Sequence, residues 1–431
     1  MSSKIKSPLF YVFLFVGISI FSCKSLEQKE TISSVRFPGE FEKQESIWLI
    51  WPTEDHIKGM SNEEVSAQII LALHKSQKVN IAVADEEVEK NAKTYLANKS
   101  IQSENISFKI IPSIQMWIRD MGPNFVISQK GEKEIVDFNF NSWGYAEVKD
   151  PDNQVEEKFD EMVAKKTNLK LISSELISEG GNRESNGEGV LMTTESVELG
   201  RNPGWTKKQI EAEFQRTLGI NKVIWLKEGV KEDDHTFKGP IVTKSGEKAY
   251  TVVTTNGHID EFARFVNDHT ILLAEVDSEE LDDPIALENH RRLEENYKIL
   301  KEATDQDGKP FEIIRIPMPK TILGIMKPGD PVYDYIATLD YQDGSSFPTG
   351  EPIKVIMAAS YLNFLIANEV VLMQKYYSYE EDLSLKETDE KAKKILESLF
   401  PMKKVIAIDA SAINFGGGGI HCITMQEPAA N

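Results

Sequence analysis

The stretch from Trp48 to Ala84 reads WLIWPTEDHIKGMSNEEVSAQIILALHKSQKVNIAVA, and its pattern indicates the fold class. Its first four residues are apolar and stop at a proline, which is typical of a short strand. Residues 61–78 then place apolar side chains on one helical face and begin with Ser-x-x-Glu, a helix N-cap signal. The apolar run Val79 to Ala84 is again strand-like. Alternation of strands and helices indicates an α/β protein.

The same alternation continues along the rest of the chain. Further strands are expected at residues 106–111, 135–140, 222–226 and 405–408, and further helices at 206–218, 284–304 and 385–400. From Phe37 onward there is no low-complexity segment and no clear linker. No exact sequence period stands out, so a solenoid is not expected, although a diverged structural repeat remains compatible with the pattern.

Composition excludes several classes of protein. The 431 residues include 49 Lys and Arg against 69 Asp and Glu, a formal net charge of −20. A nucleic-acid-binding protein needs a basic surplus, so this acidic chain is expected to bind neutral or cationic partners instead. Its two cysteines, Cys23 and Cys422, allow at most one intramolecular disulfide and exclude a disulfide-rich scaffold.

The N-terminus has the pattern of a secretory signal. Two lysines precede the apolar run Leu9 to Phe21, which at roughly 13 residues is short for a membrane span of about 20. The ending Ile-Phe-Ser-Cys resembles a bacterial lipobox. Residues 1–22 are therefore predicted to be a lipoprotein signal peptide, Cys23 the lipidated residue, and residues 23–36 a flexible tether. The predicted location is the bacterial cell envelope. The alternative is an uncleaved signal anchor.

The second cysteine is a candidate nucleophile. Cys422 lies in Gly416 to Thr424, GGGGIHCIT, where four glycines permit unusual backbone conformations next to a short segment expected to be a strand. The alternative is a small buried side chain, which is the common role of a free cysteine.

A thiol nucleophile needs a general acid or base, usually a histidine oriented by a carboxylate. His258 is the best candidate because Asn-Gly-His-Ile-Asp places Asp260 two residues on, on the same face of an extended segment. The alternatives are a surface pair or half of a metal site, but no companion metal-ligand spacing accompanies it. His421 adjoins the cysteine and is expected on the opposite face of a strand. The other five histidines are expected to face solvent: His56, His74, His235, His269 and His290.

Two further acidic residues stand beside glycine turns. Asp120 follows an arginine in Trp117 to Pro123, WIRDMGP, and Glu179 begins Glu-Gly-Gly-Asn. Alone, the first could be a structural ion pair and the second a surface turn.

Taken in order, these segments resemble the agmatine deiminase family, which is related to the bacterial-type peptidyl-arginine deiminases. The resemblance rests on Trp-x-Arg-Asp-x-Gly-Pro, Glu-Gly-Gly, Asn-Gly-His-x-Asp and the glycine run with Ile-His-Cys. The opening FPGEFE at residues 37–42 and ASYLNF at residues 359–364 also look like this family. The resemblance covers about residues 37–428.

The resemblance implies a pentein fold, an α/β propeller of five pseudo-symmetric β/α units around a central site. Residues 37–431 would form a single catalytic domain without metal or organic cofactor. Cys422 would be the nucleophile and His258 the general acid/base. The implied carboxylates around a guanidinium group are Asp120, Glu179 and Asp260, with Asn363 helping to orient the site and Trp117 adding to substrate binding.

The implied reaction is hydrolysis of agmatine to N-carbamoylputrescine and ammonia through a covalent amidino-cysteine. Export of the chain leaves open an alternative, conversion of peptide arginine to citrulline. A further alternative is an extracytoplasmic lipoprotein that binds polyamines without catalysis. The expected partners are a small guanidino cation or an arginine peptide, and a membrane reached through the lipid anchor, with no nucleic acid.

Three features depart from the family pattern. Gly419 stands where the family often has Asn, and Thr254 stands where it often has an acid directly before Thr-Asn-Gly-His. The acids Asp233 and Asp234 are separated from that motif by a stretch, about residues 235–253, that looks inserted. It is expected to be a surface hairpin or, alternatively, a flap that alters access to the site.

Overall fold

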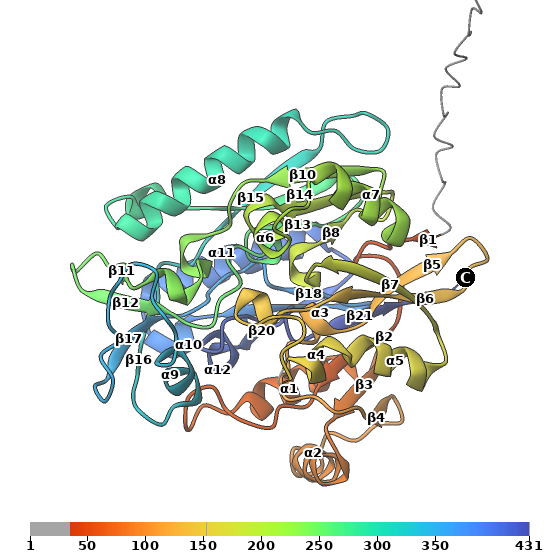
Figure 1. Ribbon diagram of the computed structural model, residues 1–431, viewed down its shortest axis with the longest axis horizontal. Helices are drawn as coiled ribbons and strands as arrows, with labels where there is room; N and C mark the ends of the chain where they lie inside the picture. Colours follow the sequence, from red (N-terminus) through yellow and green to blue (C-terminus); the bar gives the residue numbers. More distant parts are fainter. Residues whose placement is uncertain (1–34, 152, 431) are drawn as a thin grey trace, which may run out of the picture. The chain divides into compact units, whose positions relative to one another are not determined.

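The computed structural model describes residues 35–151 and 153–430, and the part from Ser33 to Asn431 forms one compact unit (Figure 1). The predicted signal peptide, Cys23 and most of the predicted tether lie outside the described residues. The tether boundary is wrong by two residues, because Val35–Arg36 form strand β1 and pair antiparallel with β5 (Asn124–Ser128). In the described part of the chain, no helix is long and apolar enough to cross a membrane.

Five of the sheets share one topology, in which a central strand has an antiparallel neighbour on one side and a parallel neighbour on the other. The five sets are β21 (Met425–Pro428), β2 (Gln44–Ile50) and β3 (Lys78–Val83); β5, β6 (Lys133–Asn139) and β7 (Lys170–Ile177); β8 (Glu184–Ser185), β9 (Val190–Thr194) and β10 (Lys222–Leu226); β13 (Ala263–Phe265), β14 (Thr270–Glu275) and β15 (Glu312–Pro317); and β18 (Leu365–Ile366), β19 (Val370–Lys375) and β20 (Lys404–Asp409). We call each set a unit and number the units 1 to 5 in this order. The first strand of unit 1 is the last strand of the chain.

Helices connect the two parallel strands of every unit, because parallel neighbours require a crossover. The connections are α1 (Asn62–Leu73) in unit 1; α4 (Gln154–Glu157) and α5 (Phe159–Thr167) in unit 2; α6 (Glu195–Arg201) and α7 (Lys207–Leu218) in unit 3; α8 (Pro284–Glu302) in unit 4; and α10 (Tyr377–Glu380) and α11 (Leu383–Leu399) in unit 5. The α/β class is thereby confirmed, and the chain contains a structural repeat that its sequence conceals. Unit 1 is extended by α2 (Glu86–Asn98) and β4 (Ile106–Ile110).

Three of the predicted helices begin where the sequence predicts. Ser61 caps α1 by accepting the Glu64 N–H, and Thr206 caps α7 in a reciprocal capping box with Gln209. The helix α8 begins with a proline after the capping side chain of Asp283. Short 3-10 turns link other elements: η1 (Ser142–Gly144), η2 (Gly180–Asn182), η3 (Lys231–Asp233), η4 (Thr236–Lys238), η5 (Ile259–Glu261) and η6 (Ser278–Glu280).

A sixth sheet stands apart from the repeat. It has the order β11 (Ile241–Val242), β12 (Lys248–Thr251), β17 (Ile353–Ile356) and β16 (Leu323–Met326), and α9 (Pro331–Ile336) follows β16. Strands β11 and β12 are antiparallel neighbours joined by a short turn, so the expected hairpin within residues 235–253 is confirmed. We call this sheet with α9 the accessory layer.

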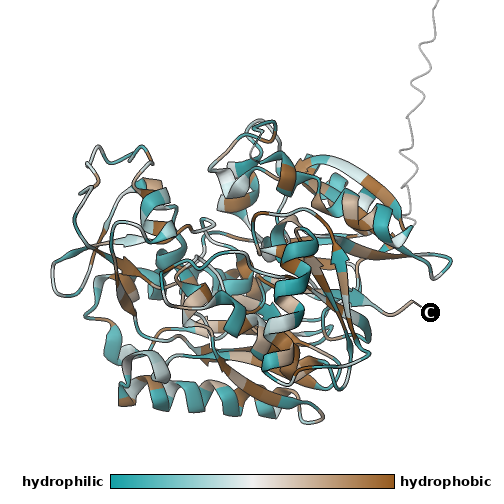
Figure 2. Cartoon of the chain, turned by 90° about the horizontal axis from the view of Figure 1, so that it is seen from below, coloured by the Kyte–Doolittle hydropathy of each residue, from teal (hydrophilic) through white to brown (hydrophobic). Residues whose placement is uncertain are grey.

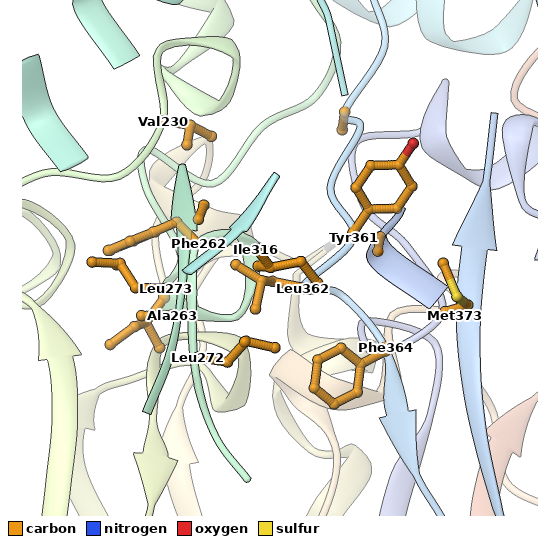
Figure 3. Packing of buried hydrophobic residues seen from close by; sticks show 14 of the residues in the cluster. Val230, Phe262, Ala263, Leu272, Leu273, Ile316, Tyr361, Leu362, Phe364 and Met373 are labelled. Carbon is orange, nitrogen blue, oxygen red and sulfur yellow. The ribbon is translucent and has the colours of Figure 1, made fainter. Parts of the chain in front are cut away.

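The core lies between the sheets and their helices. Figure 2 shows apolar residues concentrated on the strands and polar residues on the outward sides of many helices. Figure 3 shows how neighbouring units meet: Leu272 of β14 and Ile316 of β15 lie near Leu362 and Phe364, with Met373 of β19 beyond them. All five are buried in one hydrophobic cluster. The segment before β18 is therefore fixed by packing between units 4 and 5.

Candidate active site

The predicted site residues come from the same place in each unit, the segment directly before its first strand. Each of these residues lies before a first strand: Asp120 on α3 (Ile118–Met121) before β5, Glu179 before β8, His258 directly before η5 and β13, Asn363 before β18, and Cys422 before β21. Their hydrogen bonds and short distances bring these segments together, although they are spread over 303 positions of the chain (422 − 120 + 1).

The segment around Cys422 is a turn rather than the expected strand. Residues 420–423 form turns after α12 (Ser411–Asn414), and β21 begins only at Met425. The turn is held from inside, because Asn363 Oδ1 accepts the His421 N–H at 2.9 Å and Thr424 Oγ1 donates to the Ile420 carbonyl at 2.8 Å. The alternation of faces expected for His421 and Cys422 therefore does not apply, and both side chains are buried.

Cys422 is a free thiol that faces polar partners. Asn363 Nδ2 lies 3.1 Å from Sγ and also donates to Glu261 Oε1 at 2.8 Å. Asp260 Oδ2 lies 3.8 Å from Sγ. Burial, together with the nearby carboxyl groups of Asp260 and Glu261, raises the pKa of the thiol well above its ordinary value. The raised pKa favours the neutral thiol, and a positive charge nearby would favour the thiolate.

His258 lies between two carboxylates. Its Nε2 is 3.3 Å from Glu179 Oε2, and its Nδ1 is 3.6 Å from Asp120 Oδ1. Burial alone would lower the pKa of this histidine, but Asp120 and Glu179 outweigh burial and raise the pKa to about 9. The side chain is therefore an imidazolium at neutral pH and has a proton to donate.

The predicted pairing of His258 with Asp260 is wrong. The backbone from Ile259 to Glu261 is a 3-10 turn, so residues two apart do not share a face as they would in a strand. Asp260 instead binds His421, with Oδ2 2.6 Å from Nδ1. The bond to His421 outweighs burial and holds the pKa of Asp260 below its ordinary value. Asp260 Oδ1 has no hydrogen-bond partner among the described residues, so this carboxylate has an oxygen available for a ligand.

Sequence reasoning missed the partner of His421. Its Nε2 lies 2.7 Å from Glu40 Oε2, and Glu40 also binds Arg264 at 3.0 Å. Although burial opposes ionisation, His421 and Arg264 hold the pKa of Glu40 well below its ordinary value. The signal was present, because Glu40 belongs to the opening FPGEFE, but nothing in that motif assigns it a partner. The chain Glu40–His421–Asp260 fixes the orientation of Asp260.

The other two carboxylates are fixed by donors on one side. Asp120 accepts the Gly181 N–H and the Trp143 indole N–H, both at 2.8 Å. Glu179 Oε1 accepts from Arg201 Nε at 2.7 Å, and Arg201 and His258 overcome burial to lower the pKa of Glu179 to about 2. A Cβ atom on Gly181 would lie 2.5 Å from His258 Nδ1 and 2.8 Å from Asp120 Oδ1, so glycine is required for these groups to converge.

The arrangement suits a planar cation. Within the described residues, ligand atoms of Asp260, Glu261 and Cys422 lie within 4.8 Å of one another, a spacing that could also hold a metal ion. The predicted absence of a metal and of an organic cofactor stays a prediction. Fixed carboxylates around a thiol can hold a guanidinium by charge-assisted hydrogen bonds and aim its carbon at sulfur.

Of the departures from the family pattern, Gly419 has a local explanation. A Cβ atom at this position would lie 2.5 Å from Asn363 Oδ1 and 2.6 Å from Gln374 Nε2. Gln374 in turn donates to the Ser360 carbonyl and accepts from Asn414. Side chains from neighbouring segments therefore fill the space that a side chain at 419 would need.

Asp233 contacts the Asn-Gly-His motif in the folded protein, although about twenty residues separate them in the sequence. Asp233 Oδ2 accepts the N–H groups of Gly257 and His258 at 2.8 and 2.9 Å, and the Thr255 hydroxyl at 2.6 Å. Thr254 Oγ1 donates to the Asp234 carbonyl. The hairpin extends away between the two segments while Asp233 still holds the turn that carries His258.

Three of the histidines expected to face solvent do not. His74 and His235 are buried, and His56 is half-buried and stacks on Trp117 with a ring distance of 5.3 Å. Burial lowers the pKa of His56 to about 4 and that of His235 to about 3. Their sequence neighbours are polar, but the tertiary structure covers them. His269 is exposed as expected, and His290 is half-buried.

A cavity of about 650 Å³ adjoins the thiol turn. Trp117, Trp143 and Gly416 line it, and a Cβ atom on Gly418 would contact both Trp117 and Cys422 Sγ. The predicted substrate-binding residue Trp117 therefore stands between the cavity and the thiol. Val253 and residues of α9 in the accessory layer also line the cavity.

Comparison with known proteins agrees with this geometry. The family described as Porphyromonas-type peptidyl-arginine deiminase matches residues 36–428. Proteins with agmatine deiminase in their names from Latilactobacillus sakei and Marinomonas sp. are 31% and 32% identical to this chain, over 94% and 92% of it and 99% and 95% of their own lengths. The structure of the agmatine deiminase of Enterococcus faecalis is 26% identical with a TM-score of 0.71, covering 92% of this chain and 97% of that one. The chain belongs to the Porphyromonas-type peptidyl-arginine deiminase family.

Proposed function

We propose that this protein is a guanidino-group deiminase that hydrolyses agmatine to N-carbamoylputrescine and ammonia. One observation carries the proposal: a buried thiol, Cys422, and a buried imidazolium, His258, belong to one cluster with three carboxylates. A guanidinium is the ligand that such a cluster would bind, because it is planar, always charged and rich in N–H donors.

Binding prepares the nucleophile. Asp120 and Asp260 are the carboxylates that would accept the N–H groups of the guanidinium. Its positive charge offsets the negative groups that keep the Cys422 pKa high, so binding favours the thiolate. Asp260 Oδ2, 3.8 Å from Sγ, is within reach of the thiol proton. The enzyme thus generates its nucleophile mainly when substrate is present.

His258 serves both halves of the reaction. Thiolate sulfur adds to the guanidinium carbon, and the imidazolium donates its proton to the departing nitrogen, which leaves as ammonia. The amidino-thioether on Cys422 is then attacked by water, from which neutral His258 takes a proton. Collapse of this second adduct breaks the C–S bond, releases the ureido product and restores the free enzyme.

The cavity favours a substrate that ends in an amine. Three carboxylic residues line it, and none of the described lining residues is Lys or Arg. A peptide with a C-terminal arginine carries a carboxylate, which would need a cationic partner there. The family's description keeps peptidyl arginine as the second candidate substrate, and a volume of about 650 Å³ accommodates more than agmatine.

A direct assay tests the proposal. Purified protein comprising residues 33–431 is incubated with agmatine, free arginine and peptides ending in arginine, and ammonia and ureido product are measured. We expect release from agmatine, and its abolition in Cys422→Ala and His258→Ala. Full turnover by Cys422→Ala would overturn the mechanism. Tight agmatine binding without ammonia release would favour the polyamine-binding alternative.

We further infer that the five units surround this site as the pseudo-symmetric propeller of a pentein. The shared strand topology supports this, and so does the contribution of one site segment by every unit, always before its first strand. A repeat built in this way would place five equivalent segments around one axis.

We also propose that the protein is an exported lipoprotein anchored through Cys23. The proposal rests on the two N-terminal lysines, the short apolar run and the lipobox-like ending of the sequence. The catalytic unit would then act at the cell envelope on external guanidino compounds.

A further inference from the structure

The cavity beside the thiol has a buried acidic residue that the proposed mechanism does not use. Glu156 on α4 lines the cavity and is 3% exposed. Its Oε1 accepts the N–H groups of Ile114 and Gln115 at 2.7 and 2.8 Å. Its other oxygen, Oε2, is buried and has no hydrogen-bond partner among the described residues.

A buried oxygen without a hydrogen-bond donor is a candidate ligand-binding atom. A buried carboxylate oxygen without a donor loses its hydration without compensation, so a side chain held this way for packing alone is costly. Oε1 already anchors the residue to the loop that leads into Trp117, so Oε2 is free of a structural task. Burial outweighs these backbone bonds and raises the pKa of Glu156 to about 7, whereas a cation beside it would restore its charge.

Two tryptophans that line the cavity with Glu156 also contact the thiol cluster or its turn. Two residues beyond Gln115, Trp117 stands beside the thiol turn. On the other side, Asn153 of the α4 N-terminus accepts from the Ser142 hydroxyl at 2.6 Å, next to Trp143, which binds Asp120. Both tryptophans line the cavity. A flexible methylene chain would lie between them.

We propose that Glu156 binds the distal ammonium group of the substrate and so selects guanidino compounds that end in a cation. This rests on the proposed function, whose reaction occurs at the other end of the substrate. The acidic residues at the cavity rim, Glu54 and Asp150, are exposed, so solvent screens them and Glu156 carries the selectivity.

The substitution Glu156→Gln isolates this role. The Gln carbonyl can still accept from Ile114 and Gln115, while its NH₂ group replaces Oε2 and opposes a cation. Glu147→Gln is the matched control, because it makes the same charge change at an exposed residue near the cavity that does not line it. Each protein is assayed for ammonia release from agmatine and from butylguanidine, which has the same four-carbon chain without the amine.

We expect Glu156→Gln to lower kcat/KM for agmatine by about ten- to a hundredfold, the effect of one charge-assisted bond, and to leave butylguanidine within about threefold. Glu147→Gln should alter neither. An equal loss on both substrates, or no loss on agmatine, overturns the inference.

The wild-type protein gives a second, independent measurement in case Glu156→Gln does not fold. It should prefer agmatine to butylguanidine by at least about tenfold, and equal rates overturn the inference without any variant. If the wild type releases ammonia from neither compound, the proposed function itself fails, which is a different result.

Discussion

At the residue scale, the site depends on which partner each charged side chain has. His258 and His421 are both buried, yet they serve different carboxylates: Asp120 and Glu179 flank His258, and Asp260 with Glu40 flank His421. Asp120 and Glu179 keep His258 protonated, so that a proton is available beside the thiol cluster. Glu40 and His421 fix Asp260, a carboxylate that has one oxygen available for substrate.

The raised pKa of His258 predicts a pH-dependent contribution to stability. Its pKa is about 9 in the folded protein and ordinarily 6.5, so folding favours the protonated form. The stabilisation is complete below about pH 6.5 and is lost as the pH rises through 9, an effect of about 3 kcal/mol. Urea unfolding of the wild type and of His258→Gln at several pH values measures it. The stability difference should shrink toward alkaline pH, and a constant difference would contradict the assignment.

Because Asp260 lies beside the thiol, we expect Asp260→Asn to speed alkylation of Cys422 and to abolish ammonia release. Burial is the largest cause of the raised Cys422 pKa, and the negative charge of Asp260 is the next. Asp260→Asn removes that charge, so the thiolate fraction of the free enzyme increases. Alkylation by iodoacetamide should accelerate about tenfold for each unit by which the pKa falls, while ammonia release is lost. Cys422 is the sole cysteine of residues 33–431, so the modified peptide identifies the reaction. Slower alkylation would contradict this account.

At the scale of elements, each site segment precedes the first strand of a unit, and hydrogen bonds from distant segments set its conformation. The turn that carries His258 is the clearest case, because Asp233 from the end of η3 accepts three donors from residues 255–258 through one oxygen. The hairpin between them can vary in length without displacing the turn.

Asp233→Ala is therefore expected to lower both the stability of the protein and its activity. It removes the acceptor of four donors, because Oδ1 also accepts the Thr255 N–H, at a cost on the order of 3 kcal/mol or more. We also expect it to displace His258 from its carboxylates. We expect a lower urea midpoint and at least a tenfold fall in kcat. Asp307→Ala, at an exposed residue, serves as the control. Normal activity of Asp233→Ala would show that the turn is held by other contacts.

Sequence patterns predicted the elements better than the contacts between them. Apolar periodicity located the long helices α1, α7, α8 and α11 to within about five residues, because burial of one face is a local signal. It did not reveal α2 or α5. Two segments expected to be extended, Ile259–Glu261 and residues 420–423, are turns instead, because tertiary hydrogen bonds fix the backbone there. Motif resemblance singled out Cys422 and His258, which the structure places in one buried cluster. It could not pair Asp260 with His421, because that contact joins segments 161 positions apart.

At the scale of the whole molecule, repeated units and the accessory layer have different tasks. The five units supply the side chains of the thiol cluster, whereas α9 of the accessory layer and the nearby Val253 line the cavity beside it. Substrate selection can therefore change in the accessory layer without disturbing the thiol and the imidazolium.

The net charge of the whole molecule bears on how it could attach to a membrane. A net charge of −20 opposes adsorption to an anionic lipid surface, so electrostatics cannot hold the catalytic unit at a membrane. If the full chain is attached, the anchor must be hydrophobic, and the sequence places it at Cys23. Cys23→Ser, expressed as the full chain in a bacterium, should move from the membrane fraction to the soluble fraction. Its kcat/KM for agmatine should equal that of the wild type, because Cys422 belongs to the unit from Ser33 to Asn431. Retention of Cys23→Ser in the membrane fraction would instead support an uncleaved signal anchor.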